Sequence, residues 1–380
     1  MTRYRWAVLA AGTLAAASYS AILPGLAVLA PALRDRYGLG LGGIGVVLAA
    51  ATAGATLSLI PWGLLTDRLG ERIVIGVGLT GCGAGLVGAA YASSFPVFVA
   101  LLALAGLAGA AVNSASGRAV MHWFGAEQRG LALGIRQTAI PIGGAAAALV
   151  LPHFGARSGL IGLGASCVAA SAIAVALLRE GPRPVPEIGV ALARPFRDGR
   201  IWRLAGGSAL MLAPQLCLVG FLVVFLHERR GVSRGGAAGV FAAVQLLGIG
   251  ARIAAGRWSD VLRDRIVPLR RIALVSVALV LFATAAVGAP LPLLVPLLVA
   301  AGVVGMSWNG LSFTAAAELA GRERSGAAIG LQQTVLAVAG SFMPPLFGAV
   351  VAATSWRAGF ALVALFPLVG WLVLAPLGRR

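Results

Sequence analysis

Three arginines lie inside long apolar runs of the sequence, where a charged side chain is costly. They are Arg118, Arg136 and Arg252. Ionisable residues in such surroundings are rare and usually belong to a substrate or ion pathway. The acidic residues closest to these runs, such as Asp67 and Asp260, stand at the ends of runs and not in the middle. Positive charge without matching acid attracts anions, so this pattern predicts a site for a small anion.

Neutral polar side chains interrupt runs of the same kind. Together with Arg118 and Arg136 they form the predicted substrate site, and they are Tyr19, Asn113, Gln137, Gln215, Gln245, Trp308, Asn309 and Gln333. Several have a structural alternative. Asn113 and Asn309 can tie helices together by hydrogen bonds worth about 1 kcal/mol. Tyr19 and Trp308 can serve packing alone, and Arg118 stands close enough to the end of its run for its guanidinium to reach water.

The stretch GLLTDRLGER, residues 63–72, places four charges within six residues of an otherwise apolar region. Gly63 allows a neighbouring helix to come close. Asp67 is placed to accept hydrogen bonds at a helix amino terminus or to pair with a nearby arginine. Because separating a half-buried charge pair costs several kcal/mol, such a cluster can bias an equilibrium between two conformations. The alternative is an ordinary loop whose charges are solvated.

The surroundings of these residues indicate a membrane protein. The chain has 380 residues, of which 59% are hydrophobic and 11% are charged, about half the charge of a soluble domain. A helix needs about 20 apolar residues to cross a bilayer. Twelve such runs are predicted, at residues 6–30, 41–65, 73–92, 96–121, 130–152, 158–178, 203–226, 235–258, 271–289, 291–316, 326–352 and 358–377.

Charge patterning predicts the orientation of these spans and excludes other classes of protein. All thirty basic residues are arginines, and they gather in the gaps between runs. Twenty fall in the segments on the side of the amino terminus, seven on the opposite side and three within runs. The positive-inside rule therefore places both termini in the cytoplasm, in a multi-pass protein of the cytoplasmic (inner) membrane. The net charge of +18 is accounted for by these loops, so nucleic acid is not an expected partner.

The sequence divides into two similar halves. Residues 106–138 align without a gap to residues 302–334, so that Asn113 meets Asn309 and Gln137 meets Gln333 at an offset of 196 positions. GLLTD at 63–67 meets GRWSD at 256–260 at an offset of 193. This repetition indicates an internal duplication. The predicted domains are an amino-terminal six-helix half (1–178), a Pro-rich cytoplasmic linker (179–202) and a carboxy-terminal six-helix half (203–380).

The charged stretch resembles the signature loop of the major facilitator superfamily, G-x-x-x-D-(R/K)-x-G-(R/K)-(R/K). The matching residues are Gly63, Asp67, Arg68, Gly70 and Arg72, and Glu71 departs from the pattern. The second copy keeps Gly256 and Asp260. The resemblance implies an all-α membrane protein with twelve transmembrane helices in two pseudo-symmetric halves. It further implies that the two stretches form a latch at the cytoplasmic face, with Arg252 as part of the second copy.

By the same resemblance, spans one, four, seven and ten line a central cavity and spans two, five, eight and eleven flank it. The polar residues named above fall on these spans. The implied function is secondary active transport by alternating access, and the arginines favour a small organic anion as substrate. The alternatives are drug-type efflux and, from another class, a membrane receptor or scaffold without transport. The resemblance also implies a monomer, with a proton or another ion as a possible coupling partner.

An enzymatic function is not expected. His122, His153 and His227 stand apart near run ends, and Cys82, Cys167 and Cys217 fit no metal-binding spacing. No nucleophile elbow, phosphate loop or zinc pattern is present in the sequence. We therefore expect no cofactor and no metal.

Overall fold

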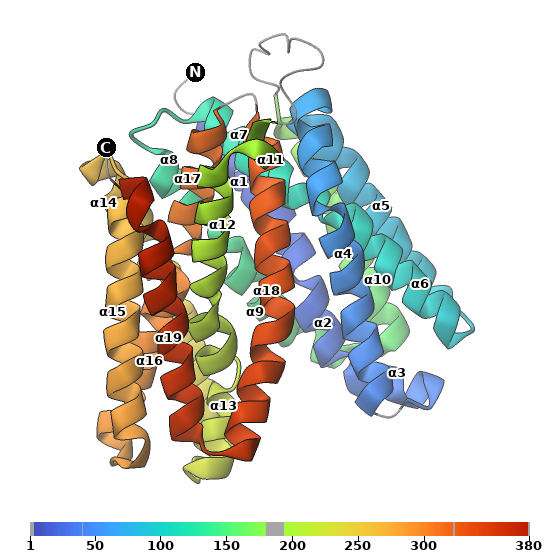
Figure 1. Cartoon of the computed structure of the whole chain (residues 1–380). Helices are drawn as coiled ribbons and strands as arrows, with labels where there is room; N and C mark the ends of the chain where they lie inside the picture. Colours follow the sequence, from blue (N-terminus) through green and yellow to red (C-terminus); the bar gives the residue numbers. More distant parts are fainter. Residues whose placement is uncertain (1–3, 40, 180–193, 322–323, 379–380) are drawn as a thin grey trace. The chain divides into compact units, whose positions relative to one another are not determined.

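The structure is a computed structural model, and it describes residues 4–39, 41–179, 194–321 and 324–378. Its described part consists of helices joined by short turns and loops, and no strand occurs among the described residues (Figure 1). Twelve helical stretches are long and apolar enough to cross a membrane, which confirms the twelve predicted spans. They are Tyr4–Val28, Val46–Leu69, Glu71–Tyr91, Phe95–Trp123, Arg129–His153, Ala156–Leu177, Gly199–Arg229, Gly236–Leu262, Ile266–Gly288, Leu291–Ala320, Ser325–Ala353 and Trp356–Gly378.

Ten α-helices precede the predicted linker. They are α1 (Tyr4–Ser20), α2 (Ile22–Val28), α3 (Ala30–Tyr37), α4 (Leu41–Leu69), α5 (Glu71–Tyr91), α6 (Phe95–Gly109), α7 (Ala111–Trp123), α8 (Arg129–Gln137), α9 (Ala139–Val150) and α10 (Ala156–Leu177). The first span is thus divided between α1 and α2. Residues 180–193 of the predicted linker lie outside the described residues.

Nine further α-helices are described after residue 193. They are α11 (Arg194–Arg197), α12 (Gly199–Leu210), α13 (Leu222–Val224), α14 (Arg234–Leu262), α15 (Ile266–Ala285), α16 (Leu291–Ser307), α17 (Asn309–Ala320), α18 (Ser325–Ala353) and α19 (Trp356–Leu374). Two π-helical turns, Pro214–Val219 and Phe225–Arg229, flank α13. Pro214 lacks an amide hydrogen, and it opens the first of these turns.

Five spans are built from two or more helical pieces, and the other seven contain one long helix. The pieces meet near Ala21, Ala110, Thr138, Met211 and Trp308. These joints lie in spans one, four, five, seven and ten. In membrane transporters, discontinuous helices are typical of the spans that bind substrate.

The charged stretch at 63–72 is mostly helical, which corrects the expected loop. α4 continues to Leu69, so Asp67 and Arg68 stand in its last turn. Gly70 alone separates α4 from α5, and its φ of 85° is a value that glycine adopts readily. α14 likewise runs through Gly256 and Asp260 to Leu262. The helical geometry fixes the direction of both carboxylates.

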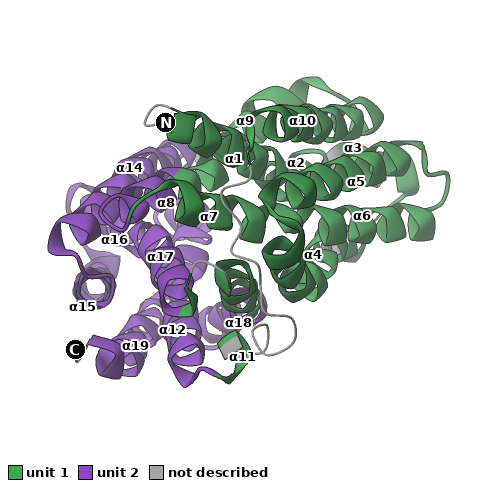
Figure 2. Ribbon diagram, turned by 90° about the horizontal axis from the view of Figure 1, so that it is seen from above, with its two compact units in different colours: residues 1–125, 136–197, 320–334 green, residues 126–135, 198–319, 335–380 purple. Residues whose placement is uncertain are grey.

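The chain groups into two compact units (Figure 2). Unit 1 comprises residues 1–125, 136–197 and 320–334, and unit 2 comprises residues 126–135, 198–319 and 335–380. Each unit therefore contains a short segment from the other half of the sequence. The division predicted at residues 178 and 203 stays a prediction about folding domains.

Small residues allow the helices of unit 1 to touch through their backbones. A Cβ atom on Gly54 of α4 would lie 2.0 Å from the carbonyl oxygen of Ala103 in α6, and one on Gly106 would lie 2.0 Å from that of Ala51. Because lipid supplies no hydrophobic driving force between helices, such close approach is a principal source of packing energy in membranes.

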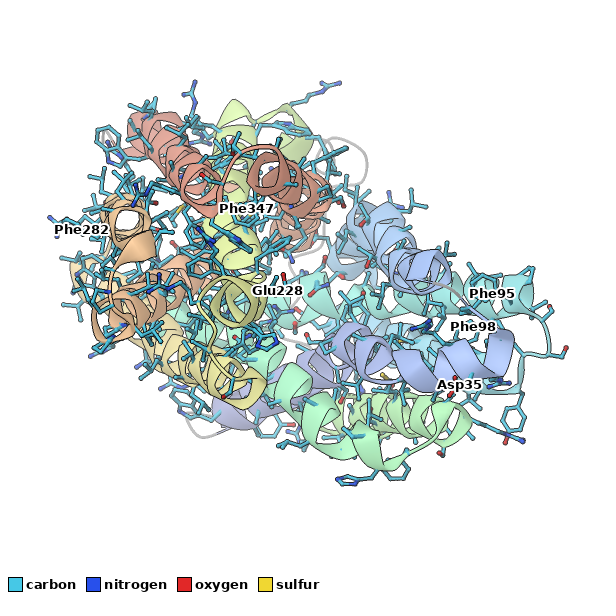
Figure 3. All side chains as sticks on the ribbon, turned by 90° about the horizontal axis from the view of Figure 1, so that it is seen from below. Asp35, Phe95, Phe98, Glu228, Phe282 and Phe347 are labelled. Atoms are coloured by element: carbon cyan, nitrogen blue, oxygen red, sulfur yellow. The ribbon has the colours of Figure 1, made fainter. Side chains whose placement is uncertain are left out.

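Aromatic clusters complete the packing in both units. In unit 1 the ring of Tyr37 contacts Phe95 and Phe98, with centroids 6.0 Å and 5.1 Å away. Figure 3 labels Phe95 and Phe98. In unit 2 Phe347 contacts Phe221 and Phe360 at 4.9 Å and 5.9 Å. These rings lie at the ends of spans opposite to Asp67 and Asp260, so they stabilise the helices that carry the candidate site.

Candidate functional site

Asp67 accepts hydrogen bonds from the first turn of a helix in the other half of the sequence. Gly326 N donates to its Oδ1 at 3.0 Å, and Ala327 N donates to its Oδ2 at 2.8 Å. Both amides belong to the first turn of α18, whose four leading N–H groups have no partner within the helix. The positive end of the helix dipole also favours a carboxylate at this place. All three residues belong to unit 1.

Asp260 repeats this arrangement in unit 2. Gly130 N donates to its Oδ1 at 2.9 Å, and Leu131 N donates to its Oδ2 at 2.8 Å. Gly130 and Leu131 stand in the first turn of α8. They precede Gly326 and Ala327 by 196 positions, the offset of the internal repeat. The two sites are thus copies of one carboxylate-to-helix contact, and each joins the two halves of the sequence.

Glycines make both contacts possible. A Cβ atom on Gly63 would lie 2.6 Å from the carbonyl oxygen of Gly326, and one on Gly256 would lie 2.2 Å from that of Gly130. The glycines of the signature stretch and of its second copy therefore serve a close backbone approach. This approach brings the amides of the facing helix within reach of the aspartate one turn later.

A cluster of charges surrounds Asp67 in unit 1. Nε of Arg118 lies 3.1 Å from Oδ1 of Asp67, and its Nη1 donates to Oε1 of Glu71 at 3.0 Å. Nδ1 of His122 lies 2.7 Å from the same oxygen of Glu71. Arg118 is 5% exposed, so its charge is balanced by two carboxylates in a nearly water-free environment. The structure therefore groups Arg118 with the predicted latch and not with the residues predicted to bind substrate.

The charges around Asp260 have a different origin. Nη1 of Arg265 lies 2.5 Å from Oδ1 of Asp260, and its Nη2 lies 3.2 Å from Oε1 of Glu318. Nη1 of Arg129 lies 3.7 Å from the same oxygen of Glu318. Arg265 stands between the eighth and ninth spans, and the hydrogen bonds from its guanidinium to Glu318 and Asp260 raise its pKa against the opposing effect of burial. A loop arginine thus replaces the helix arginine of the first copy.

Arg68, Gly70 and Arg72 of the predicted latch lie outside these clusters. Gly70 forms the turn, and the side chains of Arg68 and Arg72 are exposed. Within the described ranges, neither guanidinium has a hydrogen bond or an ion pair. Arg252 is fully buried, and its Nε donates to the carbonyl oxygen of Met306 at 2.9 Å. A Cβ atom on Gly134 would lie 2.7 Å from the carbonyl oxygen of Arg252, so Arg252 supports the contact between α14 and α8.

Arg136 stands at the centre of a polar cluster in unit 1. Its Nε donates to Oγ of Ser116 at 2.9 Å and its Nη2 to Oδ1 of Asn113 at 3.2 Å. Its Nη1 donates to Oε1 of Gln137. These three partners are neutral, and Arg136 is 2% exposed. Three of the residues predicted to bind substrate are therefore in contact, and Ser116 joins them.

The other predicted substrate residues are distributed as follows. In unit 2, Nδ2 of Asn309 donates to Oε1 of Gln215 at 3.3 Å. Trp308 is buried among Leu204, Met211 and Leu311, and its indole N–H donates to the carbonyl oxygen of Gly305, which fits the packing alternative. Tyr19 is half-buried beside Gly109. Gln245 and Gln333 are half-buried, and the side-chain oxygen of each has no hydrogen-bond partner among the described residues.

Sequence reasoning missed several residues that take part in these clusters. Glu71 was noted only as a departure from the motif and His122 only as a residue near a run end, and Ser116, Arg129, Arg265 and Glu318 were not assigned to any site. The repeat contained part of the signal, since His122 and Glu318 occupy equivalent positions at the offset of 196. The amides of Gly130 and Gly326 were aligned by the same offset.

Comparison with known proteins gives a consistent family. Residues 8–344 match the sequence profile described as Major Facilitator Superfamily. An MFS-type transporter of Mycobacterium tuberculosis, itself named as uncharacterized, is 36% identical over 373 residues, which cover 96% of this chain and 83% of that protein.

Solved structures with the same fold are much more distant in sequence. A bacterial homologue of the iron transporter ferroportin, in an outward-facing state, has a TM-score of 0.80 at 14% identity and covers 99% of this chain and 100% of its own. The human organic anion transporter TETRAN has a TM-score of 0.78 at 16% identity, covering 98% and 99%. At these identities the likeness shows the fold alone.

Proposed function

The chain belongs to the major facilitator superfamily, and on this premise we propose that it moves a small organic anion across the membrane by alternating access. Its general function, transport by a multi-pass membrane protein, follows from the family. The substrate class is the proposal. Its main support is Arg136, a buried guanidinium within the fifth span whose bonds to Ser116, Asn113 and Gln137 hold it in one orientation.

The charge balance of the spans favours an anion over a cation. Each acidic residue in the described spans stands within three residues of a span end, as Asp67, Asp260 and Glu318 do, or at the first residue, as Glu71 does. Arg136 stands seven residues after the start of its span at Arg129. A guanidinium presents several N–H groups in a plane and can bind a carboxylate with two parallel hydrogen bonds. The human fold neighbour is named an organic anion transporter, but the proposal for this chain is based on its own residues.

The interrupted helices support the same location. The joint at Thr138 directly follows Arg136 and Gln137, and the joint at Ala110 stands one turn before Asn113. In membrane transporters, interrupted helices are typical of the spans that bind substrate. The polar side chains around Arg136 and two such joints therefore lie in the same part of unit 1.

We propose that the clusters of Asp67 and Asp260 form the latch of the transport cycle. Each carboxylate binds the first turn of a helix from the other half of the sequence. Both contacts therefore have to break when the two halves separate at the face that carries Asp67 and Asp260. We propose further that this face is cytoplasmic and that the protein works as a monomer in the inner membrane, with both termini in the cytoplasm. A proton or another ion can serve as coupling partner.

The test is binding and uptake by the purified protein reconstituted in liposomes. A panel of small carboxylates, inorganic anions and lipophilic cations is first screened for an increase in melting temperature, since a ligand that binds only the folded state stabilises it. We expect stabilisation by an anion that is lost in Arg136→Gln and partly retained in Arg136→Lys. Arg252→Gln is the matched control, a buried arginine in another span, and it should retain the ligand.

Two results would contradict the anion proposal. Unchanged anion affinity in Arg136→Gln would show that Arg136 does not bind the anion and has a structural role. Stabilisation by lipophilic cations alone would favour drug-type efflux. A family transporter remains in either case, so the two results concern the substrate only.

A further inference from the structure

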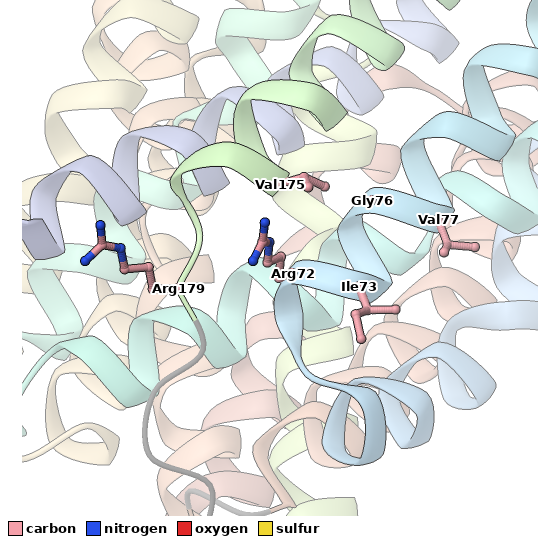
Figure 4. A pocket seen from close by; sticks show the side chains of 6 residues that line it. All are labelled: Arg72, Ile73, Gly76, Val77, Val175 and Arg179. Carbon is pink, nitrogen blue, oxygen red and sulfur yellow. The ribbon is translucent and has the colours of Figure 1, made fainter.

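A pocket opens between the first turns of α5 and the end of α10, and its lining residues do not belong to the clusters around Asp67, Asp260 and Arg136 (Figure 4). Its volume is about 610 Å³. The residues that line it are Arg72, Ile73, Gly76, Val77, Val175 and Arg179. Two arginines and an otherwise apolar lining are an unusual combination, because arginine at a helix end normally extends into water. All of these residues belong to unit 1.

The floor of the pocket is a tight contact between the two helices. Oγ of Ser171 donates to the carbonyl oxygen of Gly76 at 2.9 Å, and a Cβ atom on Gly76 would lie 2.8 Å from Cγ2 of Val175. Ile73 and Val77 are 46% and 60% exposed on the outer side of α5. In a spanning helix such side chains face lipid. The pocket therefore continues into an apolar surface.

Arg179 is held at the level where a membrane meets water. Its guanidinium lies 4.8 Å above the ring of Tyr4, and its carbonyl oxygen accepts a hydrogen bond from Nε1 of Trp123 at 3.2 Å. The hydroxyl of Tyr4 donates to the carbonyl oxygen of Leu177 at 2.6 Å. Tyrosine and tryptophan are enriched at the level of lipid headgroups. These contacts fix Arg179 at the same level.

Arg72 is available to a ligand, whereas its counterpart in the repeat is not. At the offset of 193 positions Arg72 corresponds to Arg265, which is buried against Asp260 and Glu318. In unit 1 Arg118 supplies the charge next to Asp67. Arg72 is consequently exposed, and among the described residues its guanidinium has no hydrogen bond or ion pair. It also stands in the first turn of α5, where the helix dipole favours an anion.

We propose that this pocket binds an anionic phospholipid, with the phosphate held by Arg72 and attracted by the charge of Arg179, and an acyl chain along Ile73 and Val77. Basic pockets between transmembrane helices commonly bind anionic headgroups. Free phosphate would use the two arginines but gain nothing from the apolar lining. A zwitterionic lipid would bring its own positive charge to the arginines, so the site should distinguish headgroups by charge.

The experiment measures lipid retained by the purified protein in detergent, by native mass spectrometry, with phosphatidylglycerol and phosphatidylcholine as probes. We expect the unmodified protein to retain phosphatidylglycerol at least tenfold better than phosphatidylcholine. Arg72→Gln/Arg179→Gln should lose this preference, and Arg72→Lys/Arg179→Lys should keep most of it. Arg203→Gln/Arg257→Gln removes two exposed arginines elsewhere and is the matched control; it should bind as the unmodified protein does.

Three outcomes would overturn the proposal. Equal retention of both lipids would show that charge is not recognised. Undiminished phosphatidylglycerol binding in Arg72→Gln/Arg179→Gln would place the lipid elsewhere. Displacement of the lipid by millimolar inorganic phosphate would show that the arginines bind phosphate without need of the apolar lining. Melting curves for each variant distinguish lost binding from lost folding, and the lysine variant tests binding with the charges retained.

Discussion

Glu71 illustrates how one residue that departs from a family pattern can be compensated by its neighbours. The superfamily signature usually has a basic residue at this position, but here Glu71 bonds to Arg118 and His122. The pattern alone marks Glu71 as an irregularity. The compensation is visible only once α5 and α7 are packed together, because Glu71 and His122 are 51 positions apart in the chain. The family signature therefore predicts where this cluster lies in the sequence, but it does not predict which charged residues pair in it.

We expect Glu71→Arg, which restores the usual residue, to destabilise this protein. The substitution would place a second guanidinium next to Arg118 and remove one of the two carboxylates that balance Arg118. Disrupting a buried ion pair in this way costs roughly 3–5 kcal/mol. The measurement is the free energy of unfolding or, where unfolding is irreversible, the melting temperature in detergent. Glu71→Gln is the control and should cost less, since it adds no charge. A variant Glu71→Arg as stable as the unmodified protein would refute this account of the cluster.

At the scale of the helix, the contact between α14 and α8 depends on a glycine. A methyl group on Gly256 would lie 2.2 Å from the carbonyl oxygen of Gly130, which requires one helix to move. On Gly250 of the same helix, a methyl group would have no atom within 4 Å. We expect Gly256→Ala to reduce transport at least tenfold. Gly250→Ala should leave transport unchanged and stabilise by up to about 1 kcal/mol, as alanine does in a helix interior.

The measurement for this pair is the initial rate of uptake in liposomes, normalised to the amount of folded protein. The two substitutions are chemically identical and six residues apart, so any difference reports the contact with α8. Equal rates for Gly256→Ala and Gly250→Ala would mean that the close approach has no part in transport.

The start of α12 should give the protein a small, pH-dependent stability. The carboxylate of Asp198 accepts a hydrogen bond from the backbone N–H of Arg200 at 2.9 Å, and the Arg200 side chain holds the pKa of Asp198 below its usual value. Replacing such a capping residue by alanine costs about 1 kcal/mol. Because the pKa is lowered in the folded state, this contribution is present above about pH 4 and is lost as the pH falls through the folded value.

We therefore expect Asp198→Ala to lower the melting temperature at pH 7, by an amount that shrinks as the pH falls below about 4. Arg200→Gln is the control, since it keeps the backbone hydrogen bond and removes only the side-chain one; its effect should be smaller. A difference between Asp198→Ala and the unmodified protein that stays constant with pH would exclude the capping carboxylate as its cause.

A helix could be predicted from the sequence where the residues that determine it are neighbours in the chain. The twelve spans could be predicted because each is a run of apolar residues, and length alone limits what such a run can form. The extension of α4 through Asp67 and Arg68 could not, since charged residues next to Gly70 are typical of a loop. This last turn is stabilised by the first turn of α18, 259 positions away. For the joint at Thr138 there is a local signal in Pro141, which has no amide hydrogen and whose ring clashes with the carbonyl group of Gln137. No proline stands near the joint at Ala110.

Across the whole molecule, the internal repeat preserves a geometry more strictly than it preserves residues. Both aspartates receive two backbone N–H groups at equivalent positions. The nearby guanidinium comes from Arg118 in one copy and from Arg265 in the other. The repeat aligns Asp67 with Asp260 at an offset of 193 and Gly130 with Gly326 at an offset of 196, so the first similarity is implicit in it. It could not predict the second, because the two arginines do not occupy equivalent positions.

The two contacts should open together if they belong to one conformational equilibrium. Ala132 in α8 and Ala328 in α18 are both fully buried, occupy equivalent positions and lie one residue beyond the amides bound by Asp260 and Asp67. Each can carry a single reporter cysteine, Ala132→Cys or Ala328→Cys, after Cys82, Cys167 and Cys217 are replaced. The rate at which a maleimide labels the reporter then measures how often the surrounding contact opens.

We expect Asp67→Asn to increase the labelling rate of the nearby reporter, Ala328→Cys. It should increase the labelling rate of Ala132→Cys by the same factor, although that reporter lies beside Asp260 in the other copy. Asp260→Asn should likewise act on both reporters, and the double variant should multiply the two factors, tenfold for each 1.4 kcal/mol. Transport by each single variant should fall while the variant still folds, which a cooperative melting transition shows. If each substitution accelerated labelling only at the nearer reporter, the contacts would open independently, and alternating access controlled by both would have to be abandoned. Normal transport by a well-expressed Asp67→Asn would contradict the latch directly.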